Sequence, residues 1–143
     1  MTSRRHFLSA TSAAFAASSF HIFGADPAKK YRTALIGSGW WGMNILKEAL
    51  AGGRVKVCAL CDVHEDVASN AGDTVNGISG DDPKLYKDYL ELLDKEKPEI
   101  VIIATPDHWH AKISIDALEA GKHVYCEKPM THTVEIGRAS CRE

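Results

Sequence analysis

Three glycines in this sequence have the spacing of a loop that binds the phosphates of a dinucleotide. They lie in GSGWWG, residues 37–42, which follows a short apolar run and opens a helix-like stretch. Gly37 suits a tight turn, Gly39 lets the backbone approach a phosphate, and Gly42 lets the helix pack against the strand. The first N–H groups of the helix would then face the phosphate. We therefore expect a dinucleotide to bind at Gly37, Ser38, Gly39, Trp40, Trp41 and Gly42.

An acidic side chain ends the next apolar run. The run covers residues 55–61, and Asp62 follows it. This places the carboxylate about 20 residues after the glycine motif, where it can accept hydrogen bonds from both ribose hydroxyls of an adenosine. The same charge would repel a 2′-phosphate. We therefore expect NAD as the cofactor and NADP as the poorer ligand.

A second polar loop, TPDHWH at residues 105–110, follows the apolar run at 100–104. Ligands of an open parallel sheet collect at the carboxyl ends of its strands, so this loop should border the nicotinamide half of the cofactor. Alternatively, Asp107 caps the next helix and Trp109 packs against it, and both roles are compatible. The two histidines of the loop lack a third ligand nearby in sequence, so we expect no metal site. The candidate cofactor contacts are Thr105, Pro106, Asp107 and His110.

A third loop, EKP at residues 127–129, follows the apolar run at 123–126. Lys128 can donate a hydrogen bond to a ribose hydroxyl or to a substrate oxygen, with Glu127 holding it in place. A surface ion pair of small energetic value is the alternative. Three polar loops at the ends of three strands favour the functional interpretation.

The order of apolar and amphipathic segments predicts an α/β fold, a doubly wound parallel sheet with crossover helices. The first helix should present Met43, Leu46 and Leu50 to the core and end at residues 52–53. A polar helix is expected at 65–76, followed by a loop as far as Pro83.

Two more helices are expected along the chain. One carries the stripe Tyr86, Leu90 and Leu93 and ends at residues 95–98, and the other presents Ala111, Ile115 and Leu118 and ends at Gly121. Cys58 and Cys61 fall within one predicted strand, where residues three apart point to opposite faces. We therefore expect them to be buried apolar residues and not a redox pair.

At these loops, and in the run ALEAGKHVYCEKPM at residues 117–130, the chain resembles the glucose-fructose oxidoreductase / inositol dehydrogenase / MocA family. The resemblance runs from about Tyr31 to Glu135. It implies a Rossmann domain that is incomplete here and lacks a following α/β domain. It also implies that Lys128 is catalytic, between nicotinamide and substrate, and that the cofactor is lined by Thr105, Pro106, His110 and Glu127.

The activity implied by the resemblance is NAD(P)-dependent hydride transfer with a sugar, inositol or related polyol. One alternative is an NAD-dependent glycoside hydrolase of the same family that works by oxidation and elimination, and another is a non-catalytic nucleotide-binding sensor. The acid or base that transfers the proton belongs to the following domain in that family. We therefore expect this chain to be inactive by itself and the complete protein to form a homo-oligomer.

The two ends of the chain are expected to lie outside the domain. Residues 1–25 resemble a twin-arginine export signal, with Arg4 and Arg5 before a weakly apolar stretch, and residues 26–30 form a linker. The protein should therefore meet the twin-arginine export machinery and be periplasmic, or membrane-associated through an uncleaved signal. Residues 31–135 form the truncated dinucleotide-binding domain, and residues 136–143 resemble a translated sequencing adapter.

The composition points to a small-molecule partner. The chain has 143 residues and a formal net charge of -2 at pH 7, and no basic cluster follows the first few residues. Nothing in the sequence therefore indicates binding to nucleic acid or to an acidic membrane surface.

Overall fold

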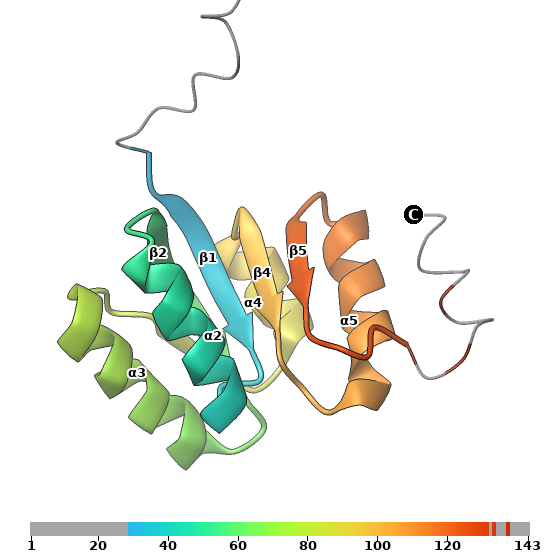
Figure 1. The fold of residues 1–143 in the computed structure, drawn as a ribbon, viewed down its shortest axis with the longest axis horizontal. Helices are drawn as coiled ribbons and strands as arrows, with labels where there is room; N and C mark the ends of the chain where they lie inside the picture. Colours follow the sequence, from blue (N-terminus) through green and yellow to red (C-terminus); the bar gives the residue numbers. More distant parts are fainter. Residues whose placement is uncertain (1–28, 132, 134–136, 138–143) are drawn as a thin grey trace, which may run out of the picture.

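Parallel strands form a sheet in the order β3-β2-β1-β4-β5 (Figure 1). The computed structural model describes residues 29–131, 133 and 137. The proposed signal, most of the linker and nearly all of residues 136–143 lie outside them. The strands are β1 Tyr31–Ile36, β2 Val55–Cys61, β3 Lys84–Tyr86, β4 Ile100–Ile103 and β5 His123–Cys126.

The helices alternate with the strands along the chain. They are α2 Trp40–Ala51, α3 Glu65–Ser79, α4 Tyr89–Glu96 and α5 Asp107–Glu119. The chain first builds outward from β1 to β3 and then returns to place β4 on the other side of β1. This confirms the predicted doubly wound α/β fold, with its topological switch point between β1 and β4.

Each face of the sheet packs against one pair of helices (Figure 1). Leu46 of α2 and Val75 of α3 pack with Leu60 on one face, whereas Leu92 of α4 and Ile113 of α5 pack on the other. Burial of each such side chain contributes about 1.5–3 kcal/mol. No helix in the described part of the chain is long and apolar enough to cross a membrane.

A bulge in β2 changes the expected placement of its cysteines. Thr33 pairs with Val57 and Ala34 pairs with Ala59, so Cys58 has no partner on β1. The extra residue brings Cys58 and Cys61 into the same core cluster, although they were expected on opposite faces. Both thiols are buried and free, and burial raises the pKa of Cys61 to about 12.

The first two helices follow their predicted patterns with one extension. In α2, Met43 and Leu46 are buried and the helix ends at the Gly52 cap, as expected. Helix α3 continues to Ser79 through a stretch expected to be loop. Gly77 and Ile78 of this extension are exposed, and the Ser79 hydroxyl donates a hydrogen bond of 3.1 Å to the Val75 carbonyl in the last turn. Gly80, with φ of 73°, ends the helix.

The third crossover differs from the prediction because β3 was not recognised. Tyr86 belongs to β3 and not to a helix. Helix α4 begins after Asp88, whose carboxylate accepts a hydrogen bond of 2.8 Å from the backbone N–H of Leu90. This cap fixes the helix so that Leu92 and Leu93 are buried and Leu90 is half exposed.

Helix α5 presents a face that only partly matches the prediction. Its buried residues are His110, Ala111, Ile113, Ser114 and Ala117. Of the predicted residues, Ala111 is buried, Ile115 is partly buried and Leu118 is exposed. The expected cap by Asp107 is wrong, because Pro106 occupies the cap position and no side chain caps the helix. Asp107 lies in the first turn, where its charge is favourable to the helix dipole.

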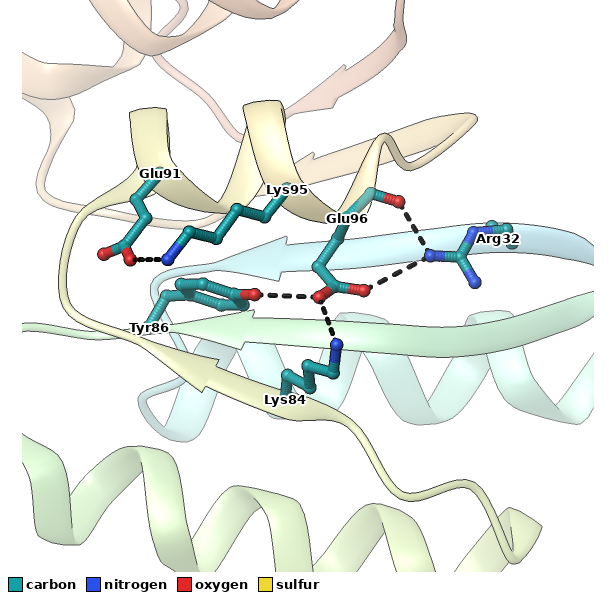
Figure 2. A network of polar contacts seen from close by, with 6 residues as sticks. All are labelled: Arg32, Lys84, Tyr86, Glu91, Lys95 and Glu96. Atoms are coloured by element: carbon teal, nitrogen blue, oxygen red, sulfur yellow. Dashed lines mark hydrogen bonds and ion pairs between the residues drawn. The ribbon is translucent and has the colours of Figure 1, made fainter.

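A polar network joins β1, β3 and α4 around the Glu96 carboxylate (Figure 2). Tyr86 donates a hydrogen bond of 2.8 Å to it, and Lys84 and Arg32 lie 3.0 and 3.3 Å away. The Tyr86 hydroxyl, with Lys84 and Arg32, holds the pKa of Glu96 below its usual range. Burial and the same hydrogen bond raise the pKa of Tyr86 to about 12. The neighbouring pair Lys95 and Glu91 lies on the exposed side of α4.

Candidate functional site

The three polar loops lie at the carboxyl ends of β1, β4 and β5. Backbone hydrogen bonds fix their positions, with Gly37 donating to the Cys61 carbonyl at 2.8 Å and Ala104 donating to the Ile36 carbonyl at 2.9 Å. Glu127 donates to the Ile103 carbonyl at 3.0 Å. The sheet register therefore brings the glycine loop, the TPDHWH loop and the EKP loop to one edge.

Two of the three glycines are required by packing within the protein. A Cβ at Gly37 would lie 2.6 Å from the Ala104 carbonyl oxygen, and the φ of this residue is +89°. A Cβ at Gly42 would lie 2.0 Å from the Gly37 carbonyl oxygen. These glycines let α2 start directly against the end of β1.

Gly39 differs, because a Cβ there would meet no protein atom within 4 Å. Its φ of -65° and ψ of -177° are accessible to other residues. The fold itself therefore does not require glycine at this position. An open backbone at the start of a helix is the cradle that a pyrophosphate needs.

The start of α2 provides hydrogen-bond donors for an anion. Gly39 is the cap residue, no side chain caps the helix, and its first turn has no acidic residue. The first N–H groups of a helix have no partner within the helix. The next two residues of the helix, Trp40 and Trp41, are 77 % and 48 % exposed.

Asp62 is held beside the glycine loop. One carboxylate oxygen accepts hydrogen bonds from the backbone N–H of Ser38 at 3.0 Å and from the Ser38 hydroxyl at 3.5 Å, and the other accepts one of 3.1 Å from the backbone N–H of His64. The second oxygen has a lone pair for another donor. The carboxylate is therefore oriented and can still accept a ribose hydroxyl.

A cavity of about 350 Å³ lies beside Asp62 and reaches the TPDHWH loop. Its lining includes predicted residues, Gly37, Asp62, Thr105 and Pro106, and others that the sequence analysis did not identify, Val63, Lys87, Asp88, Tyr89, Trp109 and Ile113. Three of the latter follow β3, the strand that was not recognised. Pro83 and the helix-capping Asp88 lie on either side of the apolar Leu85. This pattern could have located β3 and the residues that follow it.

A second cavity, of about 310 Å³, lies at the EKP loop. It is lined by Trp41, Ala104, Thr105, Asp107, His110, Glu127 and Lys128. Thr105 lines both cavities, and its hydroxyl oxygen is buried with no hydrogen-bond partner among the residues that the structure describes. Since an unpaired buried hydroxyl is costly, this atom is suited to a ligand. The orphaned hydroxyl and the open backbone at Gly39 together fit a bound dinucleotide.

The Glu127 carboxylate lies among several polar neighbours. It accepts a hydrogen bond of 3.2 Å from the Tyr125 hydroxyl. The Trp41 indole first, then Tyr125 and the backbone N–H and charge of Lys128, lower the pKa of Glu127 below its usual range. The Lys128 ammonium is thus an electrostatic neighbour of Glu127, and Lys128 is exposed at the cavity wall.

His110 is 2 % exposed and bridges two of the loops. Its Nδ1 lies 2.8 Å from the Pro129 carbonyl oxygen, and its Nε2 lies 2.8 Å from the Thr105 carbonyl oxygen. Both ring nitrogens are therefore engaged by the protein. The ring lines the second cavity, but its polar atoms face the backbone.

A larger cavity, of about 700 Å³, lies over the part of the sheet beside α2. Its wall includes Ile100, Ile102, Val55 and Tyr125. None of the three glycines of the loop, nor Asp62, lines it. We therefore do not assign the dinucleotide to this cavity despite its size. In the described part of the chain, no group of three or more His, Cys, Asp or Glu side chains is placed to hold a metal ion.

Comparison with known proteins agrees with this geometry. The model of the GFO_IDH_MocA family, described as "Oxidoreductase family, NAD-binding Rossmann fold", matches residues 31–142. A curated glycosyl hydrolase family 109 protein from Stenotrophomonas maltophilia is 39% identical over 134 residues, which cover 87% of this chain and 29% of the relative. A glycosyl hydrolase family 109 protein from Shewanella sp. (strain MR-4) is 35% identical over 108 residues, covering 73% and 24%.

Solved structures show the same fold. Myo-inositol 2-dehydrogenase from Lactobacillus plantarum has a TM-score of 0.70 at 26% identity, covering 80% of this chain and 32% of that protein. An NAD-binding protein from Listeria innocua has a TM-score of 0.69 at 35% identity, with coverage of 80% and 32%. The WlbA dehydrogenase from Bordetella pertussis, solved with NADH and UDP-GlcNAcA, has a TM-score of 0.66 at 25% identity, with coverage of 80% and 34%. The chain spans less than a third of the length of the curated relatives.

Proposed function

The chain belongs to the GFO_IDH_MocA oxidoreductase family, with its NAD-binding Rossmann fold, and on this premise we propose that the complete protein transfers a hydride between NAD and a sugar, inositol or related polyol. The substrate class rests on the family resemblance. Dehydrogenases of an inositol and of a nucleotide sugar among the solved relatives support it.

The arrangement of the two cavities carries the proposal. The first has Asp62 in its wall, the second has Lys128, and Thr105 lines both. The glycine loop lies between these ends on the central strand. An extended dinucleotide would therefore have its adenosine ribose at Asp62 and its reactive end at Lys128.

NAD, when bound, supplies the hydride acceptor. The residues of this chain bind and orient the reactants. The Asp62 carboxylate would accept a hydrogen bond from the adenosine ribose, the start of α2 would bind the pyrophosphate, and the Thr105 hydroxyl would give a further polar contact. The Lys128 ammonium donates a hydrogen bond to the oxygen on the reacting carbon, an interaction that strengthens as negative charge develops there. The proton of the substrate hydroxyl goes to a group in the part of the protein that follows this chain.

A glycoside hydrolase reaction is the second candidate, favoured by relatives of 35% and 39% identity that are named glycosyl hydrolase family 109. In that reaction the sugar is oxidised transiently, the aglycone is eliminated, water adds to the carbon that carried it and the ring is reduced again, with the cofactor remaining bound. The same binding residues serve both candidates. The difference lies in whether the nicotinamide returns to its starting state within one turnover.

Two assays on the complete purified protein separate the candidates. With free NAD and a panel of inositols and reducing sugars, a rise in absorbance at the reduced nicotinamide band supports the dehydrogenase. With a panel of aryl glycosides and no added cofactor, release of the aryl group supports the hydrolase. NAD binding without either signal would contradict both and favour a nucleotide-binding sensor.

We also propose that the protein is exported by the twin-arginine machinery, because a folded cofactor enzyme suits an exporter of folded proteins. Replacing Arg4 and Arg5 by lysine should leave a tagged protein in the cytoplasmic fraction, and unchanged periplasmic or membrane recovery would contradict this. A homo-oligomer is the expected state of the complete protein, which light scattering checks.

A further inference from the structure

His110 is a buried polar residue on a helix face that otherwise carries small and apolar side chains. It lies in the first turns of α5 and is 2 % exposed. A buried imidazole needs hydrogen-bond partners. Both of its partners are backbone carbonyls of loops that border the Lys128 cavity.

The two contacts join segments that no strand pairing holds together. The Thr105 carbonyl belongs to the loop after β4, whereas the Pro129 carbonyl lies beyond the end of β5. Ladder hydrogen bonds between β4 and β5 end at Ile103 and Cys126, and one more backbone bond fixes Glu127. Among the described residues, the next contact along the EKP loop is that of the His110 ring with the Pro129 carbonyl. Lys128 therefore lies between two residues, Glu127 and Pro129, whose backbones are held by hydrogen-bonding contacts.

The ring must donate to at least one of these carbonyls. A carbonyl oxygen only accepts, and a neutral imidazole has one N–H, so each neutral tautomer makes one of the two hydrogen bonds. A ring with both nitrogens protonated makes both. The forms of the ring that carry a proton on Nδ1 donate to the Pro129 carbonyl and so bond the EKP loop to α5.

We propose that His110 is a positioning residue that acts through Lys128, holding the EKP loop against the TPDHWH loop so that the ammonium stays at the cavity. This rests on the proposed function, in which Lys128 contacts the reacting oxygen. The resemblance implied that His110 lines the cofactor. The structure assigns its polar atoms to the backbone instead.

The kinetic test is a double-mutant cycle in the complete protein with His110→Ala, Lys128→Ala and the double variant. His110→Ala should lower kcat about 10- to 100-fold, because a small misplacement of a reacting group is costly. It should leave the NAD dissociation constant nearly unchanged. In the Lys128→Ala background the same substitution should have little further effect. His110→Gln retains a donor and should recover part of the loss.

His108→Ala is the matched control. His108 lies on the same helix, but its side chain is 63% exposed, so its removal should leave turnover unchanged. Additive losses in the cycle, or an NAD affinity that falls as much as kcat, would overturn the proposal. A merely structural histidine would lower the thermal midpoint without coupling to Lys128.

A measurement on the cofactor-free wild-type protein keeps the test independent of activity and of variant folding. In ¹⁵N-edited NMR, at least one ring proton of His110 should be visible and protected from solvent exchange, unlike those of His108. The Met130 amide resonance should shift in His110→Gln and not in His108→Ala. Rapidly exchanging His110 ring protons would refute the link even if hydride transfer is found. Absent hydride transfer with a protected ring would refute the proposed function alone.

Discussion

Gly39→Ala should abolish most NAD binding without unfolding the protein. The added Cβ would meet no protein atom within 4 Å, and the backbone angles at this position suit alanine. Alanine is a poorer cap residue than glycine, which costs about 0.5–1 kcal/mol. Alanine also has fewer conformations than glycine in the unfolded chain, which stabilises the folded state by roughly 0.4–1 kcal/mol and offsets the cost at the cap. We therefore expect little net change in the free energy of unfolding.

The effect on the ligand should be much larger. The methyl group would occupy the space through which the pyrophosphate reaches the start of α2. Each hydrogen bond to a charged group that is lost costs about 1.5–3 kcal/mol. Loss of one such bond should weaken NAD binding about 10- to 150-fold, since every 1.4 kcal/mol is about tenfold. Gly39→Val should weaken it further.

Gly42→Ala is the comparison that separates packing from binding. Its Cβ would lie 2.0 Å from a backbone oxygen, so α2 must shift, at a cost of about 1–3 kcal/mol or more. Denaturant unfolding gives the stabilities of both variants of the complete protein, and isothermal titration gives the NAD dissociation constants. A folded Gly39→Ala variant that binds NAD like the wild type, or a Gly42→Ala variant of wild-type stability, would refute the assignment of the loop.

Three further predictions concern the two ends of the site and the fold. The wild type should bind NAD more tightly than NADP by about 1–3 kcal/mol, and Asp62→Ala should reduce this difference. Equal dissociation constants of the wild type for the two cofactors would contradict this role of Asp62. Lys128→Ala should lower kcat by about 100-fold or more while changing NAD affinity little, and an unchanged kcat would remove Lys128 from the reaction. Glu96→Gln should destabilise the protein by about 0.5–1.5 kcal/mol at pH 7. Because the folded-state pKa of Glu96 is lowered, this difference is present above the usual glutamate pKa and should disappear as the pH falls through the folded-state value. Denaturant unfolding at several pH values checks it, and a difference that persists in acid would mean that Glu96 acts through packing.

The parts of the site that depend on local sequence were predictable. Apolar runs with clear limits precede the glycine loop, Asp62 and Glu127 in the sequence. In the structure these runs form strands β1, β2 and β5. The conformational demands of Gly37 and Gly42 also follow from the motif. The close approach at Gly42 is to Gly37 of the same loop, whereas that at Gly37 is to Ala104 after β4.

The parts that depend on tertiary packing were not predictable. Strand β3 has three residues, and its Lys84 and Leu85 are exposed, so it has no apolar run to reveal it and is marked only by the flanking Pro83 and Asp88. The inward face of α5 is set by its contacts with β4, β5 and α4, which favour small residues and admit His110. The contact of the His110 ring with the Pro129 carbonyl joins two loops far apart in the sequence. No spacing rule connects such residues.

A crystal structure of the complete protein with NAD tests the central claim most directly. The account predicts the pyrophosphate at Gly39 and the start of α2, an adenosine ribose hydroxyl on the Asp62 carboxylate, and the nicotinamide ring beside Thr105 and Lys128. NAD bound in the cavity over Ile100, Ile102 and Tyr125, or a nicotinamide ring remote from Lys128, would contradict it.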